Sequence, residues 1–390
     1  MKTIIDTDSL NAFCKSAADY PYITVDTEFL RERTYYSKLC LIQLALPGKS
    51  NDNAVLVDPL VEGLSLEPLY QLFLNTAIVK VFHAARQDLE IFCLGADVVP
   101  TPLFDTQVAA MVCGFGDQVG YETLVNKITR KSLDKSSRFT DWSRRPLSDA
   151  QKSYALADVT HLRQIYEFLN KKLDENGRSK WLEEELEILT TPETYIIRPE
   201  DAWQRVKTRS SSPKFLAAVK TLAYFRELHA QTTDVPRNRI FKDDALIEVA
   251  STLPKSMQDL QKSRLLQREA RKGIISEGIL KAIKMASEIP DSELSKAPAP
   301  PDRQNVNPAL ADLLRVLLKA NTEKVGVAAK LIASASDLDT MASGDFDVPA
   351  MQGWRYQVFG MEAEKLCKGE IGLSTDGKNV VCIPIEIEPL

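Results

Sequence analysis

Residues 23–29, Ile-Thr-Val-Asp-Thr-Glu-Phe, decide which fold the sequence predicts. Apolar and polar side chains alternate along this run with a period of two residues. This period is typical of a β-strand, in which successive side chains point to opposite faces of a sheet. Ile23, Val25, Thr27 and Phe29 then share one face, and Thr24, Asp26 and Glu28 share the other. One strand is therefore predicted to present the Asp26 and Glu28 carboxylates together.

Two further acidic segments lie far from this strand along the chain. Asp88 falls early in a predicted helix over residues 84–94, which follows a strand-like stretch at 79–83. Tyr154 and Asp158 are four residues apart in a long helical stretch, and this spacing stacks the phenol and the carboxylate on one helix face. The sequence therefore offers four carboxylates and a phenol from three separate elements.

A cluster of these carboxylates predicts bound cations. At about 4 Å separation, two carboxylates repel by roughly 4 kcal/mol when the effective dielectric constant is near 20. Hard oxygen ligands favour Mg²⁺ or Mn²⁺ over Zn²⁺. Two such ions about 4 Å apart hold both the attacking and the leaving oxygen of a phosphoryl displacement. The pattern therefore indicates a site for two divalent metal ions, Mg²⁺ or Mn²⁺, that act on phosphodiesters.

The ordered segments resemble the three motifs of the DEDD superfamily of 3′–5′ exonucleases, in the variant with a tyrosine four residues before the third-motif aspartate. Over about the first 200 residues the sequence is similar to the ribonuclease D family within that superfamily. The similarity extends to Arg33-Thr34-Tyr35-Tyr36, Leu41-Ile42-Gln43-Leu44, Leu133-Asp134-Lys135-Ser136 and Asp141-Trp142-Ser143-Arg144-Arg145-Pro146-Leu147. The resemblance implies a metal-dependent 3′–5′ exoribonuclease. It also implies that nucleoside 5′-monophosphates are released from the 3′ ends of tRNA precursors and other small structured RNAs.

The resemblance also implies a role for each site residue. Asp26, Glu28 and Asp158 would hold the metal that activates water. Asp26 would bridge to the second metal, which Asp88 would support directly or through water. Tyr154 would orient the attacking water. Because free tyrosine, with a pKa near 10, is a poor base at pH 7, the lowered pKa of metal-bound water is expected to carry the deprotonation.

The order of predicted elements gives the fold class of the first domain. Strands are expected at 23–29, 39–46, 54–57, 79–83 and 103–105, and helices at 66–75, 84–94, 106–113, 121–129 and 149–173. Strands come first and then alternate with helices, which predicts a mixed central sheet flanked by helices, the ribonuclease H-like plan. Ser148 and Gln151 form a predicted capping box that starts the Tyr154 helix.

Substrate contacts are expected in the polar loop at 130–147, beside the predicted metal site. Basic and aromatic side chains in such a loop suit the phosphates and bases of a single strand. Lys135 and Arg138 are the favoured contacts. Phe29 either abuts the terminal base or, as its strand parity favours, faces the core.

Other residues near the motifs have structural explanations. Trp142 is expected to anchor the loop by packing, with base stacking as the alternative. Arg144 and Arg145 suit hydrogen bonding within the loop as well as substrate binding. Asp105 ends the predicted strand at 103–105 and precedes the predicted helix at 106–113, a position that suits an N-cap or a metal ligand. His83 is expected in the core or beside the ligands, and His161 to face the same buried seam as Asp158.

Composition favours an intracellular enzyme of several domains. The chain has 390 residues, of which 44% are hydrophobic. Six scattered cysteines without a Cys-x-x-Cys pair, and only three histidines, support neither a zinc ribbon nor a disulfide framework. The N-terminus lacks the features of a signal peptide, and no apolar run approaches 18 residues. We therefore expect a cytoplasmic protein with no membrane association and no obligate protein partner.

Charge and composition divide the chain into predicted domains. Residues 1–205 form the exonuclease domain, and 206–289 resemble the helicase and ribonuclease D C-terminal (HRDC) domain, an all-α module. A Pro-rich linker at 290–308, with Pro298, Pro300 and Pro301, precedes a second, divergent HRDC-like helical domain at 309–390.

Positive charge is concentrated in the middle of the chain. Residues 203–284 hold 17 Lys and Arg against 8 Asp and Glu, whereas 1–202 hold 22 against 30 and 285–390 hold 10 against 16. This basic block is predicted to neutralise RNA phosphates. A solvated helical surface is the alternative explanation.

Two other functional classes fit part of the pattern. A DNA 3′–5′ exonuclease of repair or proofreading type would use the same carboxylates, and only a contact with the ribose 2′-OH separates the two substrates. A non-enzymatic RNA-binding protein with a decayed site is disfavoured because all five site residues are present.

Overall fold

The structure is a computed structural model that describes residues 2–134, 137, 140–208, 210, 212–294 and 306–385. Lys135 and Arg138 lie outside the described residues, as do Pro298, Pro300 and Pro301 of the predicted linker. The chain divides into two compact units. The first comprises 1–28, 41–194 and 303–390, and the second comprises 29–40 and 195–302. The domain boundaries at 205, 289 and 308 stay a prediction.

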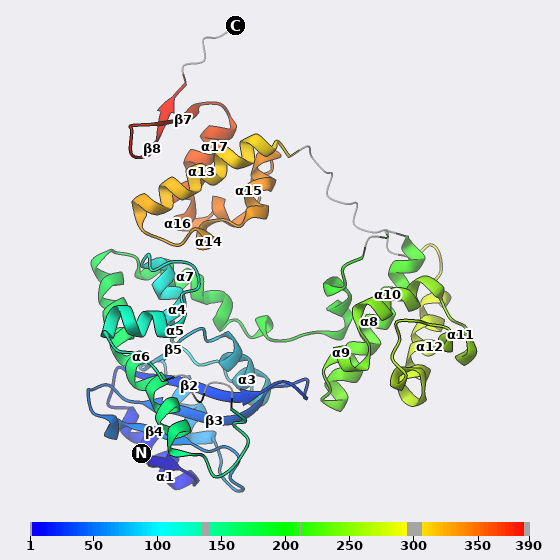
Figure 1. The fold of residues 1–390 in the computed structure, drawn as a ribbon, viewed down its shortest axis with the longest axis horizontal. Helices are drawn as coiled ribbons and strands as arrows, with labels where there is room; N and C mark the ends of the chain where they lie inside the picture. Colours follow the sequence, from blue (N-terminus) through cyan, green and yellow to red (C-terminus); the bar gives the residue numbers. More distant parts are fainter. Residues whose placement is uncertain are drawn as a thin grey trace. The chain divides into compact units, whose positions relative to one another are not determined.

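The first unit is built around a six-stranded mixed sheet in the order β1-β4-β3-β2-β5-β6. Figure 1 labels β2, β3, β4 and β5 of this sheet. Its strands are β1 (Lys2–Ile4), β2 (Tyr22–Leu30), β3 (Lys38–Ala45), β4 (Ala54–Val57), β5 (Val79–Phe82) and β6 (Leu103–Asp105). β3 pairs antiparallel with β4, whereas β1 with β4, β2 with β5 and β5 with β6 are parallel. The predicted mixed sheet is confirmed, and β1 is an additional strand that periodicity did not indicate.

Helices flank this sheet. They are α1 (Thr7–Ala17), α2 (Glu67–Leu74), α3 (Arg86–Ala96), α4 (Thr106–Val112), α5 (Tyr121–Leu124), a π turn (Val125–Thr129), α6 (Asp149–Glu175) and α7 (Ser179–Thr190). The long helix α6 begins at the predicted capping box, in which Ser148 and Gln151 exchange hydrogen bonds between side chain and backbone. It packs on the sheet, because the Thr24 hydroxyl donates to the Val159 carbonyl over 2.9 Å. The capping box thus sets where α6 begins, and packing on the sheet brings its middle beside β2.

The C-terminal part of the first unit is helical and ends in a β-hairpin. Its elements are α13 (Pro308–Val325), α14 (Ala329–Ile332), α15 (Ala335–Ala342), α16 (Gly353–Arg355), a π turn (Tyr356–Gly360), α17 (Met361–Cys367), β7 (Ile371–Thr375) and β8 (Val380–Pro384). Trp354 stacks on Trp181 of α7 with ring centroids 4.4 Å apart, and Arg355 pairs with Glu185. These contacts join the C-terminal helices to the sheet domain within one unit.

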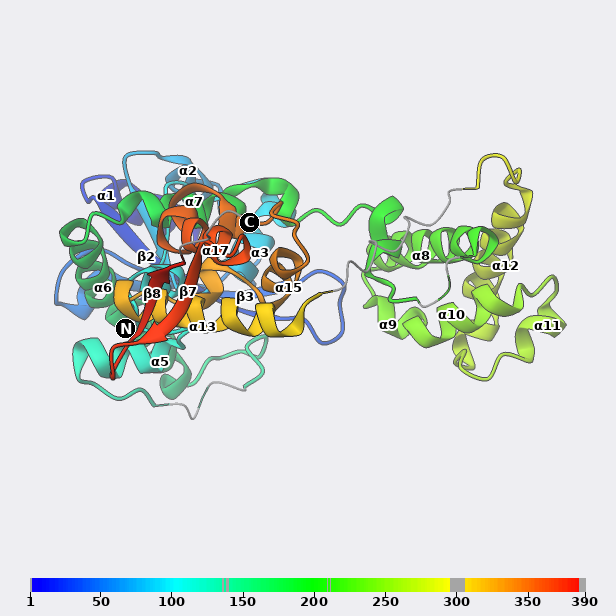
Figure 2. The ribbon, with the colours of Figure 1, turned by 90° about the horizontal axis from the view of Figure 1, so that it is seen from above.

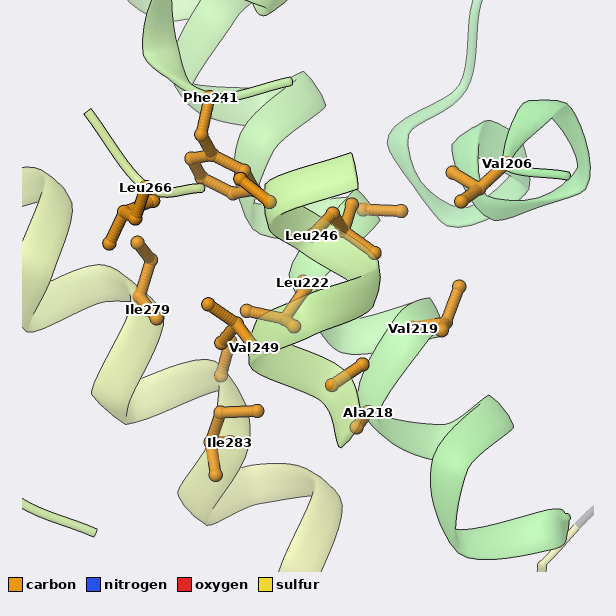
Figure 3. Packing of buried hydrophobic residues seen from close by; sticks show 14 of the residues in the cluster. Val206, Ala218, Val219, Leu222, Phe241, Leu246, Val249, Leu266, Ile279 and Ile283 are labelled. Carbon is orange, nitrogen blue, oxygen red and sulfur yellow. The ribbon is translucent and has the colours of Figure 1, made fainter. Parts of the chain in front are cut away.

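The second unit has an α-helical core (Figures 2 and 3). Its helices are α8 (Pro213–Thr233), α9 (Arg237–Ile240), α10 (Asp243–Thr252), α11 (Met257–Gln261) and α12 (Gly273–Glu288). Leu222 of α8, Leu246 of α10 and Ile279 of α12 are fully buried together. The turn between β2 and β3 joins this unit, because the Tyr35 and Tyr36 amides both donate to Asp234. The predicted fold class, an α/β domain followed by helical domains, is confirmed.

Candidate active site

Three carboxylates from two elements of the first unit lie close together. Asp26 and Glu28 extend from β2, and Asp158 extends from α6. One carboxylate oxygen from each lies within 4.8 Å of the other two. The shared strand face of Asp26 and Glu28 and the packing of α6 against β2 account for this arrangement. The acidic cluster, as we call these three residues, offers the hard oxygen ligands that divalent cations such as Mg²⁺ prefer.

Asp88 lies in the first turn of α3 and outside this group of three. Its carboxylate is buried and accepts a hydrogen bond from the Thr27 hydroxyl. Its negative charge nevertheless raises the pKa of both Asp26 and Glu28. Asp88 therefore acts on the acidic cluster through its charge. Its carboxylate is held by Thr27, which lies between Asp26 and Glu28 on β2.

Burial raises the pKa of Asp26, Glu28 and Asp88, and repulsion from neighbouring carboxylates adds to the rise at Asp26 and Glu28. For Asp26, burial is the largest cause, followed by the charges of Asp88, Asp158 and Glu28. Burial and the charges of Asp158 and Asp88 raise the pKa of Glu28 to about 9. Burial raises the pKa of Asp88 to about 7, although the hydrogen bond from Thr27 opposes the rise. Without a cation, the site therefore favours protonated carboxyls, and positive charge would relieve the repulsion.

Tyr154 lies one helical turn before Asp158. Both residues line a cavity of about 280 Å³, together with Asp26 and His83. Its ring is 6.1 Å from that of Trp142, which is 2% exposed. The packing role predicted for Trp142 agrees with this burial. Tyr154 thus lines the same cavity as Asp26 and Asp158, two of the three clustered residues.

Tyr121 is a site residue that the sequence did not single out. Its hydroxyl lies 2.5 Å from the carbonyl oxygen of Asp158 and 3.1 Å from that of Ala157. It therefore holds the backbone of α6 at the residue that carries a clustered carboxylate. No sequence motif marks it, because Tyr121 and Asp158 are 37 residues apart.

His83 lines the cavity without belonging to the acidic cluster. Its Nδ1 lies 3.0 Å from the Thr106 hydroxyl, which donates to the Phe82 carbonyl over 3.0 Å. Because Thr106 has one hydroxyl proton, Nδ1 carries the histidine proton and donates it to Thr106. This geometry matches the expected position of His83 beside the ligands. Asp105 caps α4 by accepting from the Gln107 amide, so the N-cap explanation holds.

The remaining predicted residues do not belong to the acidic cluster. Phe29 is half-buried and does not line the cavity. Arg145 pairs with Asp58 over 2.5 Å and donates to the Trp142 carbonyl, and Arg144 pairs with Asp141 over 3.3 Å. These are the structural roles that the loop sequence allowed. His161 lines a different cavity from Asp158, contrary to the shared seam expected for them.

Comparison with known proteins places this site in a family. Residues 1–174 match the family model described as 3′–5′ exonuclease, and residues 215–283 match the HRDC domain. Ribonuclease D of Jannaschia sp. strain CCS1 is 61% identical over 383 residues, covering 98% of this chain and 99% of the relative. Ribonuclease D of Acidiphilium cryptum strain JF-5 is 47% identical, with coverage of 97% and 96%. The predicted resemblance is thus confirmed along nearly the whole chain.

A solved structure agrees with these relatives. The crystal structure of Escherichia coli RNase D, an exoribonuclease involved in structured RNA processing, superimposes with a TM-score of 0.83 at 27% identity. It covers 94% of this chain and 98% of its own. These findings favour the predicted exoribonuclease over a DNA exonuclease. No helix within the described residues is long and apolar enough to span a membrane. The chain belongs to the ribonuclease D family of 3′–5′ exoribonucleases.

Proposed function

We propose that this exoribonuclease shortens RNA 3′ ends by hydrolysis with two divalent cations, Mg²⁺ or Mn²⁺, and releases nucleoside 5′-monophosphates. The observation that supports this most directly is the convergence of Asp26, Glu28 and Asp158 oxygens within 4.8 Å of one another. The donor set consists of carboxylate oxygens, and repulsion within it raises the pKa of Asp26 and Glu28. Both features fit divalent cations with a preference for oxygen.

Each carboxylate has a proposed role. Asp26, Glu28 and Asp158 would hold one cation, and Asp26 with Asp88 would serve the second. Asp88 would act directly or through water, because it lies outside the group of three. When bound, the cations would lower the pKa of water and stabilise the charge that develops on the phosphate.

Tyr154 is proposed to orient the attacking water by a hydrogen bond. Its position in the cavity with Asp26 and Asp158 supports this role. Tyr121 is proposed as a positioning residue, since its hydroxyl holds the Asp158 carbonyl. Tyr154 would then orient the water, and Tyr121 would hold the backbone of α6.

The proposed substrates are tRNA precursors and other small structured RNAs. The role of the Escherichia coli relative in structured RNA processing supports this choice. The basic block at 203–284, with 17 Lys and Arg against 8 Asp and Glu, would add phosphate contacts. Contacts by Lys135, Arg138 and Phe29 stay predictions, as do a cytoplasmic location and the lack of an obligate protein partner.

One matched pair of substrates tests the proposal. A duplex with a 3′ overhang is prepared with the overhang as RNA or as DNA, and cleavage is followed with Mg²⁺, Mn²⁺ or chelator. We expect nucleoside 5′-monophosphates from the RNA overhang and none with chelator. Equal cleavage of both overhangs, or cleavage that persists in chelator, contradicts the proposal.

A further inference from the structure

The first unit contains a second cavity, of about 370 Å³, on another face of α6. Its walls come from the turn between β3 and β4, from the start of the loop at 130–147, and from α6 itself. Lys49, Asp52, Lys131, His161 and Arg163 are its charged and titratable lining residues. We call it the Lys131 cavity.

This cavity and the active-site cavity are separated by one helix. Tyr154 and Asp158 line the active-site cavity, whereas their immediate neighbours Ser153 and Ala157 line the Lys131 cavity. Adjacent residues of an α-helix point about 100° apart, because 3.6 residues complete one turn. The two cavities therefore lie on adjoining faces of α6 at the same height along the helix.

Arg163 is a built part of the Lys131 cavity. Its side chain is 3% exposed, and its Nη1 donates to the carbonyls of Leu46 and Ser50 over 3.1 and 3.0 Å. Its Nε donates to the Thr160 carbonyl over 3.2 Å. Within the described residues, no hydrogen bond is found for the remaining amino group, Nη2. The guanidinium is thus fixed in place by backbone carbonyls with one donor group to spare.

Positive charge dominates the lining. Lys49 and Lys131 are exposed, and neither has an ion-pair partner among the residues that the structure describes. Asp52 is the single acidic lining residue, and it already accepts a hydrogen bond from the Ser50 hydroxyl over 2.7 Å. Besides burial, the charges of Lys131 and Arg163 lower the pKa of His161. The cavity is therefore suited to an anion.

We propose that the Lys131 cavity binds a backbone phosphate of the RNA strand, on the 5′ side of the nucleotides at the acidic cluster. A fixed guanidinium with two exposed lysines matches the charge and the oxygen acceptors of a phosphodiester. Because the two cavities lie on adjoining faces of α6, the proposed path takes a single strand from the active-site cavity across this helix. This inference rests on the proposed function, since it assumes that the 3′ end is hydrolysed at the acidic cluster.

Chain length tests the proposal. Binding of a ten-nucleotide single strand and of a dinucleotide is compared in Ca²⁺, with wild-type protein and with the double variant Lys49→Ala/Lys131→Ala. The Kd of the longer strand is expected to rise about tenfold, or about threefold per lysine, and the Kd of the dinucleotide much less. The matched control is Lys15→Ala/Lys180→Ala, which removes two exposed lysines that line neither cavity. An equal loss with the control, or an equal loss for both lengths, overturns the proposal.

The histidines provide a local readout. The chain has three, His83 at the active site, His161 in the Lys131 cavity and His229 in the second unit. In NMR spectra of histidine-labelled protein, the ten-nucleotide strand is expected to shift the ring signals of His83 and His161, and the dinucleotide only those of His83. A His161 signal that stays fixed while His83 responds contradicts the proposal.

Two further comparisons distinguish a backbone phosphate from a free nucleotide, and failure of the phosphate site from failure of the proposed function. In the first, inorganic phosphate and AMP are each added without RNA. A shift of the His161 ring signals at concentrations as low as those at which RNA shifts them would indicate a free-nucleotide site instead. If no metal-dependent hydrolysis of RNA is seen, the proposed function has failed. If hydrolysis is intact and the double variant binds both lengths like wild type, only the phosphate site has failed.

Discussion

The Thr27 hydroxyl donates a hydrogen bond to the carboxylate of Asp88, although the two residues are 61 positions apart. Thr27 lies between Asp26 and Glu28 on β2, and Asp88 lies in the first turn of α3. This bond lowers the pKa of Asp88 against the effect of burial. Thr27 therefore connects two acidic motifs and keeps one carboxyl closer to its ionised form.

Thr27→Val should weaken divalent cation binding at pH 7 and slow hydrolysis. Valine keeps the shape of threonine but removes the donor, so the pKa of Asp88 rises further. The loss should shrink as the pH is raised, because Asp88 then ionises without help. Mg²⁺ titrations of wild type and variant at pH 7 and pH 9 measure this loss of cation affinity. Thr129→Val is the control, since that hydroxyl donates to the Val125 carbonyl within its own turn. A loss that is independent of pH would argue against the proposed role of the bond.

Asp26→Asn and Asp158→Asn should each abolish hydrolysis while preserving the fold. Each change removes a proposed ligand and also relieves repulsion in the cation-free protein. The cation-free Tm should therefore rise or stay constant, whereas the Tm gain on adding Mg²⁺ should disappear. Thermal unfolding with and without Mg²⁺ checks both statements, with the exposed Asp19→Asn as control. Turnover like that of wild type in either variant would refute the metal assignment.

Tyr154→Phe should slow the chemical step by about 10²-fold or more, with little change in metal affinity. The phenol is proposed to orient water, and it is not proposed as a metal ligand. Single-turnover kinetics at saturating Mg²⁺ gives the rate, and the Mg²⁺ dependence gives the affinity. An unchanged saturated rate with a large loss of metal affinity would reverse this assignment.

The stability of the cation-free protein should fall as the pH rises from about 5 to about 9. Glu28 and Asp88 have pKa values of about 9 and about 7 in the folded protein, against 4.5 and 3.8 for the unperturbed groups. The folded state therefore binds more protons than the unfolded state in this window, and stability decreases with pH. Saturating Mg²⁺ should reduce the slope of the free energy of unfolding against pH, because the carboxylates are then neutralised by the cations. Urea unfolding at a series of pH values measures it. A slope that Mg²⁺ does not alter would mean that the acidic cluster is not its source.

Two lysines of the second unit should contribute to the salt dependence of RNA binding. Lys255 and Lys281 are exposed, and neither has an ion-pair partner in the described part of the chain. Lys255→Ala/Lys281→Ala should reduce the slope of log K against log salt by about 0.7 for each lost phosphate contact on a single strand. The exposed pair Lys330→Ala/Lys365→Ala, in the C-terminal helices of the first unit, is the control. Equal slopes for wild type and both variants would assign the basic block to packing or to protein contacts.

Local sequence pattern is sufficient to predict part of the site. Period two places Asp26 and Glu28 on one strand face, and the four-residue spacing places Tyr154 and Asp158 on one helix face. The capping box at Ser148 follows from side chains three residues apart. Each relationship depends on backbone geometry over a few residues, so the pattern of residue types is sufficient to predict it.

Tertiary structure alone decided which distant residues support these parts. The Thr27 hydroxyl donates to the Asp88 carboxylate, and the Tyr121 hydroxyl donates to the Asp158 carbonyl. The Arg163 guanidinium donates to the Leu46 carbonyl, 117 residues away. The parallel pairing of β1 with β4 and the division of the chain into two units are also non-local. No spacing rule marks such pairs, because each forms only when packed helices and strands bring separate segments within hydrogen-bond reach. Local periodicity therefore predicts the carboxylates and the phenol, whereas packing decides their distances, their protonation and the second cavity behind them.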